Sequence, residues 1–101
     1  MNKKVVIELV RGKLKSGVDE KTVMEALDTM HDLIEKNPGF ISREIFKGED
    51  RLIGAVVHWS SLEEAKQAEK QVHESPASAK LFSLLDPDSM RVEFLEVIKK
   101  Y

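Results

Sequence analysis

The sequence predicts one α+β domain whose elements follow the order β-α-β-β-α-β. Three features indicate this order: a β-branched run at Val5–Val10, a Pro38-Gly39 break between a helix and a strand, and a strand that closes on Trp59 shortly before a capping serine, Ser61. Such an order is typical of a four-stranded antiparallel sheet with two helices on one face, the ferredoxin-like arrangement.

The first half of the chain is expected to supply a central strand and a long helix. Val5–Val10 has the β-branched composition of a strand. Asp19 is a suitable N-cap for a helix that ends at Asn37, because the residue before a proline is disfavoured in the α region. The apolar residues of this helix recur at helical spacing, and they are Val23, Met24, Leu27, Met30, Leu33 and Ile34.

A hairpin, a helix and a final strand are expected to follow. The hairpin joins Phe40–Phe46 to Arg51–Trp59 through a short polar turn. Ser61 and Glu64 have the spacing of a capping box, so a second helix begins there with a narrow face of small residues. Ser75-Pro76 starts a short separate helix over 77–85, and the fourth strand spans 90–98.

Composition limits the classes of function. The chain has 101 residues, which suits a single domain over residues 1–101, and its formal net charge of −2 favours no nucleic-acid partner. The absence of cysteine excludes disulfides, thiolate catalysis and cysteine metal sites. No signal-peptide pattern or membrane-length apolar run occurs, so we expect a cytoplasmic protein with no membrane partner.

One face of the expected sheet has no helix to cover it. Strand alternation places apolar side chains on both faces of the first strand, and an open face that is half apolar favours a second copy as its partner. His58 precedes Trp59 and therefore points to this open face. A homodimer through the open sheet face is the expected assembly.

Charged residues inside strands have two interpretations. Glu8, Arg43, Glu44 and Glu93 are expected to face solvent or to form cross-strand ion pairs, and at a dimer interface they would instead line a polar channel. The sequence assigns no particular role to Glu8 or Arg43. For His58 it indicates only a place on the open face.

Trp59 also has two interpretations, which the sequence leaves open. The side chain is either a core anchor that packs the strand end against the helices or one wall of a ligand pocket. No two histidines have the i, i+4 spacing of a metal site, and no glycine-rich phosphate loop or serine nucleophile elbow is present.

Three segments together resemble the antibiotic biosynthesis monooxygenase (ABM) superfamily. They are Pro38-Gly39-Phe40, the run from Trp59 to Ala65, and Ser75-Pro76 with Phe82, and the resemblance spans about the whole chain. It implies a dimeric α/β barrel in which two sheets pack through their uncovered faces. It also implies a ligand cavity between sheet and helices.

The resemblance further implies a cofactor-independent monooxygenase that acts on a small aromatic or quinol-like substrate, with no cofactor and no metal. His73 is the candidate proton acceptor, and Trp59, Met30 and Phe82 are the candidate substrate-binding residues. Haem degradation, the activity of another branch, is not expected, because that branch uses an asparagine on the first strand and Val5–Val10 has none.

The alternative is a non-catalytic dimeric module of the same fold that binds a small apolar ligand. The sequence contains no convincing base or oxyanion donor pair, which slightly favours this alternative. RNA-recognition domains share the element order but display aromatic residues on their central strands and a basic surface, and both are missing here. Amino-acid-sensing domains are usually attached to a further unit, for which the chain has no room.

Overall fold

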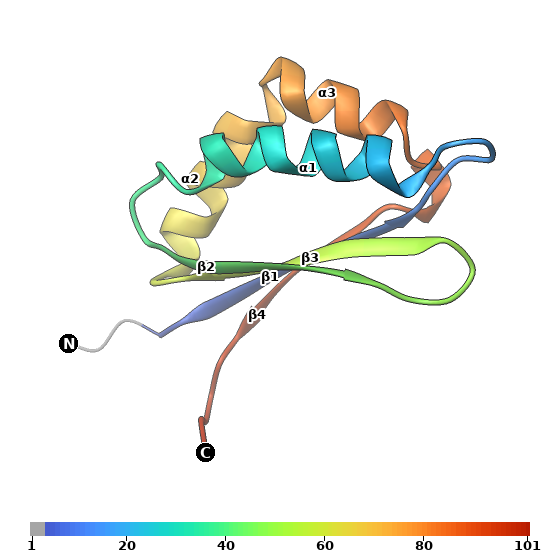
Figure 1. Ribbon diagram of the computed structural model, residues 1–101. Helices are drawn as coiled ribbons and strands as arrows, with labels where there is room; N and C mark the ends of the chain where they lie inside the picture. The colour runs from blue at the N-terminus through green and yellow to red at the C-terminus, as the bar shows by residue number, and fades with distance from the viewer. Residues whose placement is uncertain (1–3) are drawn as a thin grey trace.

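The computed structural model describes residues 4–101, which form one antiparallel sheet of four strands covered by helices (Figure 1). The strand order is β2-β3-β1-β4, and every neighbouring pair is antiparallel. The strands are β1 (Val6–Lys13), β2 (Phe40–Lys47), β3 (Leu52–Trp59) and β4 (Arg91–Glu96).

All helices lie on the same side of this sheet, and the opposite side is bare (Figure 1). They are α1 (Glu20–Ile34), α2 (Leu62–His73) and α3 (Pro76–Ser83), followed by the single 3₁₀ turn η1 (Pro87–Ser89). The ferredoxin-like order and the covered and open faces predicted from the sequence are confirmed. None of the helices within residues 4–101 is long and apolar enough to cross a membrane.

Side-chain caps begin each helix where the sequence indicates. Asp19 accepts a hydrogen bond from the Thr22 amide at 2.8 Å, and hydrogen bonds from Thr22 lower the pKa of this aspartate. Ser61 accepts from the Glu64 amide at 3.2 Å and donates to the Glu64 carboxylate at 2.9 Å. The predicted start of α2 is therefore confirmed.

The predicted end of α1 at Asn37 is wrong, because the helix stops at Ile34 with Glu35 as its C-cap. The Asn37 side-chain amide donates to the carbonyl of Leu33 at 2.9 Å, and its backbone amide donates to Ile34 at 3.1 Å. These bonds satisfy the last carbonyls of the helix from outside it, so the chain turns before it reaches the proline.

Strand register decides which side chains meet the helices. Val6 pairs with Trp59 and Glu8 with Val57 across β1 and β3, so all four lie on the covered face. The buried core between sheet and helices comprises Val6, Val23, Ala26, Leu27, Met30, Ile34, Ile53, Ala55, Val57, Trp59, Ala65, Ala68, Val72, Leu81 and Leu85. A charged residue, Glu8, therefore sits within the apolar layer.

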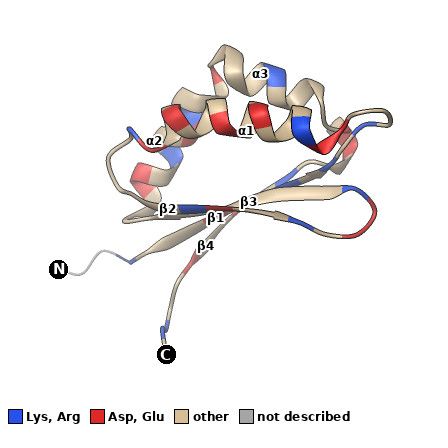
Figure 2. Ribbon diagram, viewed as in Figure 1, with Lys and Arg blue, Asp and Glu red and all other residues tan. Residues whose placement is uncertain are grey.

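The open face mixes apolar and polar residues. Ile7 pairs there with both His58 and Leu95, and the His58 ring lies 3.4 Å from the Ser42 hydroxyl. Acidic and basic residues are interspersed along the helices (Figure 2), whereas the inner strand β3 contains no Lys, Arg, Asp or Glu. The open face consequently has apolar side chains available for contact with a partner.

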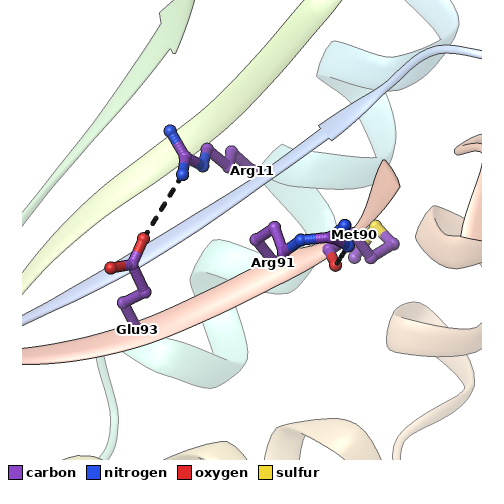
Figure 3. Close-up of polar contacts among 4 residues, drawn as sticks. All are labelled: Arg11, Met90, Arg91 and Glu93. Carbon is purple, nitrogen blue, oxygen red and sulfur yellow. Dashed lines mark hydrogen bonds and ion pairs between the residues drawn. The ribbon is translucent and has the colours of Figure 1, made fainter. Parts of the chain in front are cut away.

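An ion pair crosses the open face between β1 and β4. Arg11 donates to Glu93 at 3.4 Å, while the neighbouring Arg91 turns toward the backbone and donates to the carbonyl of Met90 at 2.7 Å (Figure 3). The predicted cross-strand pairing is confirmed for Glu93. Because both partners are about half exposed, this pair contributes little to stability.

Gly54 in β3 is expected to be intolerant of a side chain. A Cβ at this position would overlap the carbonyl oxygen of Val10 and the ring of Phe46, and the carbonyl belongs to the sheet backbone. We expect Gly54→Ala to lower the free energy of unfolding by about 1–3 kcal/mol, measured by urea denaturation. Gly48→Ala is the control, since its Cβ would meet only the flexible side chain of Leu52 at 3.1 Å. Equal stability of the two variants would contradict the prediction.

Candidate functional site

A cavity of about 450 Å³ lies between the covered face of the sheet and the helices. Its walls are mostly apolar and come from β1, β3 and all three helices, including Leu27, Val57, Ala68, Val72 and Leu81. Cavities of this size and character are typical of small-molecule sites. The few polar side chains that reach it therefore determine its chemistry.

Trp59 forms part of the inner wall. Only 1% of its surface is exposed, and its ring packs edge-on against Phe40 with the ring centroids 5.8 Å apart. Its indole N–H donates to Oε1 of Glu8 at 3.0 Å. Trp59 is thus a core anchor and a cavity wall at once, and its polar atom is already satisfied by the protein.

Glu8 is the buried carboxyl of the cavity, with 8% of its surface exposed. Burial raises the pKa of Glu8, and the nearby charge of Glu69 raises it further, whereas the Trp59 hydrogen bond and the charge of Arg43 lower it. The folded protein therefore holds this proton more tightly than the unfolded chain. The resulting contribution to stability is complete below the ordinary glutamate pKa and is lost as pH rises through the raised pKa.

Arg43 enters the cavity from β2, where it pairs with Val57. Its Nη1 donates to the carbonyl of Leu27 at 3.2 Å. Burial lowers the pKa of Arg43, although the charges of Asp28 and Glu8 oppose this change. The guanidinium thus places a positive charge near Glu8 without a direct ion pair among the contacts of residues 4–101.

The expectation that Glu8 and Arg43 face solvent or form cross-strand pairs is wrong. The β1–β3 and β2–β3 registers place both on the covered face, where Glu8 is buried and Arg43 is partly buried. Strand alternation places Glu8 on the same face as Val6 and Val10, but Ile7 and Leu9 make the other face apolar as well. Nothing in the sequence alone told which of the two apolar faces of β1 the helices cover.

The four residues predicted for the site all line the cavity, at different depths. Trp59 and Met30 are buried in its wall, and Phe82 is half-buried. His73 is exposed at the rim, and its ring lies 5.6 Å from that of Phe82. The roles assigned to these residues stay predictions, and Glu8 is a second candidate proton acceptor that lies deeper than His73.

A shallower pocket adjoins the cavity at this rim and shares Glu69 and His73 with it. Lys66 and Lys70 lie there together with Glu74, and the Lys66 ammonium is 5.9 Å from the centre of the Phe94 ring. Within the described part of the chain, no three histidine or carboxylate side chains come together as metal ligands would.

Comparison with known proteins gives structural similarity without sequence similarity. No family model matches the sequence. No curated protein matches it either.

Solved structures with the same fold cover nearly the whole chain. SnoaB, a cofactor-independent oxygenase from Streptomyces nogalater solved as an asparagine-to-alanine variant, has a TM-score of 0.82 and 13% identity over 96% of each chain. A candidate antibiotic biosynthesis monooxygenase from Caulobacter crescentus has a TM-score of 0.79 and 9% identity, covering 97% of this chain and 93% of that one.

A third similar structure is a dimeric ferredoxin-like protein of unknown function from a Jannaschia species. Its TM-score is 0.74 with 18% identity, covering 92% of this chain and 99% of that one. At such identities the similarity establishes a shared fold. The resemblance to ABM proteins predicted from the sequence is therefore confirmed at the level of the fold.

Trp59 offers a direct measurement of the Glu8 pKa, because it is the single tryptophan of the chain and is hydrogen-bonded to that carboxyl. We expect Trp59 fluorescence to titrate with a midpoint above the ordinary glutamate value of 4.5. Glu69→Gln should lower the midpoint, because it removes a neighbouring negative charge.

Glu8→Gln should abolish the transition altogether, and Glu93→Gln, on the open face, should leave it unchanged. A titration that persists in Glu8→Gln would show that another group controls the fluorescence.

Proposed function

We propose that this protein is a dimeric, cofactor-independent monooxygenase of the ABM type that oxidises a small phenolic or quinol-like aromatic molecule. The observation that carries the proposal is the buried carboxyl of Glu8, held by Trp59 in an apolar cavity and raised in pKa. A carboxyl in such surroundings is a stronger base than one in water. The fold shared with a cofactor-independent oxygenase supports the same reaction class.

The reaction needs a substrate with an acidic C–H bond, such as a methylene group activated by a phenol or a ketone. The base removes one proton, and the resulting carbanion passes one electron to dioxygen. Recombination of the substrate radical with superoxide forms a C–O bond, and protonation gives a hydroperoxide. Loss of the second C–H proton and cleavage of the O–O bond then yield a ketone and one water, so CH₂ and O₂ become C=O and H₂O.

The protein would contribute binding, exclusion of water and proton transfer. The apolar walls hold a flat substrate away from solvent, and the Trp59 ring forms one of them. Glu8 would accept the proton, and the positive charge of Arg43 would favour the anionic substrate that results. His73 at the rim is the alternative acceptor, which would act where the substrate meets solvent.

We further propose that two copies pack through their open sheet faces. Ile7 and Leu95 are paired on that face, and Leu95 is 43% exposed. The dimeric ferredoxin-like protein from Jannaschia supports this assembly.

Native mass spectrometry is expected to show a dimer, because dimerisation would remove the apolar side chains of the open face from water. Leu95→Glu should shift the protein toward the monomer, since it would bury an unpaired charge at the interface. Leu62→Glu is the matched control: Leu62 is 45% exposed, but it lies at the start of α2, on the helical side. A monomeric wild type would contradict the proposed assembly.

Oxygen consumption with a panel of anthrones and naphthols tests the reaction. We expect Glu8→Gln to lower kcat by about 10²–10⁴-fold, the usual contribution of a general base, with a smaller change in KM. His73→Gln should have a smaller effect on kcat if Glu8 is the acceptor.

Glu63→Gln, on the exposed side of α2, should match the wild type in this assay. If His73→Gln abolishes turnover and Glu8→Gln retains it, the proton acceptor is at the rim. If the wild type binds these compounds without consuming oxygen, the catalytic proposal is wrong.

One observation favours the second candidate, a non-catalytic module that binds a small ligand in the same cavity. The indole N–H of Trp59 donates to Glu8 and is therefore not free to stabilise a developing oxyanion on a substrate. Binding of the same compounds without turnover would support this candidate.

A further inference from the structure

The helices cover the inner strand β3 fully and the edge strand β4 only in part. All residues on the covered face of β3 are buried, and they are Ile53, Ala55, Val57 and Trp59. The register with β1 places Val92 and Phe94 on the same face of β4, yet Val92 is 45% exposed and Phe94 is only partly buried. The strand also diverges from the helices toward its C-terminal end (Figure 1). An apolar strip of β4 therefore lies uncovered beside the cavity.

The cavity reaches solvent at this strip. Most of its lining residues are buried or partly buried, and exposed ones lie around β4: Val92 on the strand, Pro87 in η1 just before it, and His73 at the end of α2. Arg11 is also exposed, but its side chain lies on the open face in the ion pair with Glu93. A residue that lines a cavity and is also exposed marks the place where the cavity opens. The mouth is therefore bounded by β4, η1 and the end of α2.

The opposite edge of the cavity is closed by contacts between β2 and α1. Arg43 of β2 donates to a backbone carbonyl of α1 at 3.2 Å, and Lys47 of β2 pairs with Glu20 of α1 at 3.1 Å. On the β4 side, the Lys66 ammonium of α2 lies 5.9 Å from the centre of the Phe94 ring, which is near the outer limit of a cation–π contact. The structure thus favours passage across β4 over passage across β2.

We propose that small ligands enter and leave the cavity across β4, and that Val92 controls their passage. This inference rests on the proposed function, in that it assumes a small aromatic ligand in the cavity. It does not depend on catalysis, since a non-catalytic binding module would need the same entrance. A side chain at the mouth affects entry and exit alike. A change in its size should therefore alter the rates of binding and release together and leave the affinity nearly the same.

Stopped-flow fluorescence with N-phenyl-1-naphthylamine, an uncharged aromatic probe, tests the proposal. Energy transfer from Trp59, the single tryptophan, reports binding. We expect Val92→Phe to lower the association and dissociation rate constants together by about three- to tenfold, because a larger side chain narrows the mouth. The Kd should change by less than about twofold. Val92→Ala should raise both rate constants, because a smaller side chain widens the same mouth.

Leu62→Phe is the matched control. Leu62 is as exposed as Val92, at 45%, but it lies at the start of α2 and is not among the residues that line the cavity. This variant should bind and release the probe at the rates of the wild type.

Unchanged rate constants in both Val92 variants, with normal binding of the probe, would overturn the entrance across β4 and leave the proposed aromatic site intact. A loss of affinity with an unchanged association rate constant would show that Val92 contacts the bound ligand instead, which also overturns its access role. If the probe does not bind the wild type, this inference and the proposed aromatic site both fail.

Discussion

The hydrogen bond between the Trp59 indole and the Glu8 carboxyl is the interaction on which the rest of the cavity depends. It joins the last residue of β3 to the middle of β1 at 3.0 Å, inside the layer between sheet and helices. Each partner would be costly to bury alone, since the indole N–H and the carboxyl both need a partner there. Because they pair with each other, Trp59 can pack in the core while the neighbouring Glu8 lines the cavity.

This pair also explains why the cavity has a defined chemistry. The helices pack over an apolar sheet face, and among the described residues they bury Glu8 and Ser78 and partly bury Arg43. Burial acts in opposite directions on the two charged groups, because it raises the pKa of Glu8 and lowers that of Arg43. The opposite charges of the ionised carboxyl and the guanidinium offset part of the cost of burying each group. An apolar core of the same shape would have no such cost to offset.

The sequence predicted the architecture well because its strongest signals are local. The β-branched run, the Ser61 and Glu64 cap and the position of Trp59 at a strand end depend on neighbouring residues, and each is confirmed. The end of α1 was predicted too late because the side chain of Asn37 competes for the last helical carbonyls.

The site was less predictable because it depends on contacts between distant segments. The face that Glu8 occupies is set by the pairing of β1 with β3 and by the helices above, while both faces of β1 carry apolar residues. Ser78 had no signal at all, since a serine in the first turn of a helix is ordinarily exposed. The residues that the ABM resemblance indicated do meet in one cavity, and the polar groups beside them came only from the structure.

The same burial that would make Glu8 a stronger base also makes its ionised form costly for the fold. A higher pKa strengthens the base but reduces the ionised fraction that can accept a proton, so the best value lies near the working pH. Burial and the charge of Glu69 raise the pKa of Glu8, while the Trp59 hydrogen bond and the Arg43 charge lower it. A purely structural position would have no need of this balance, since an apolar residue would pack there without the penalty. An acid within an apolar cavity is the feature that the proposed proton exchange with a ligand would use.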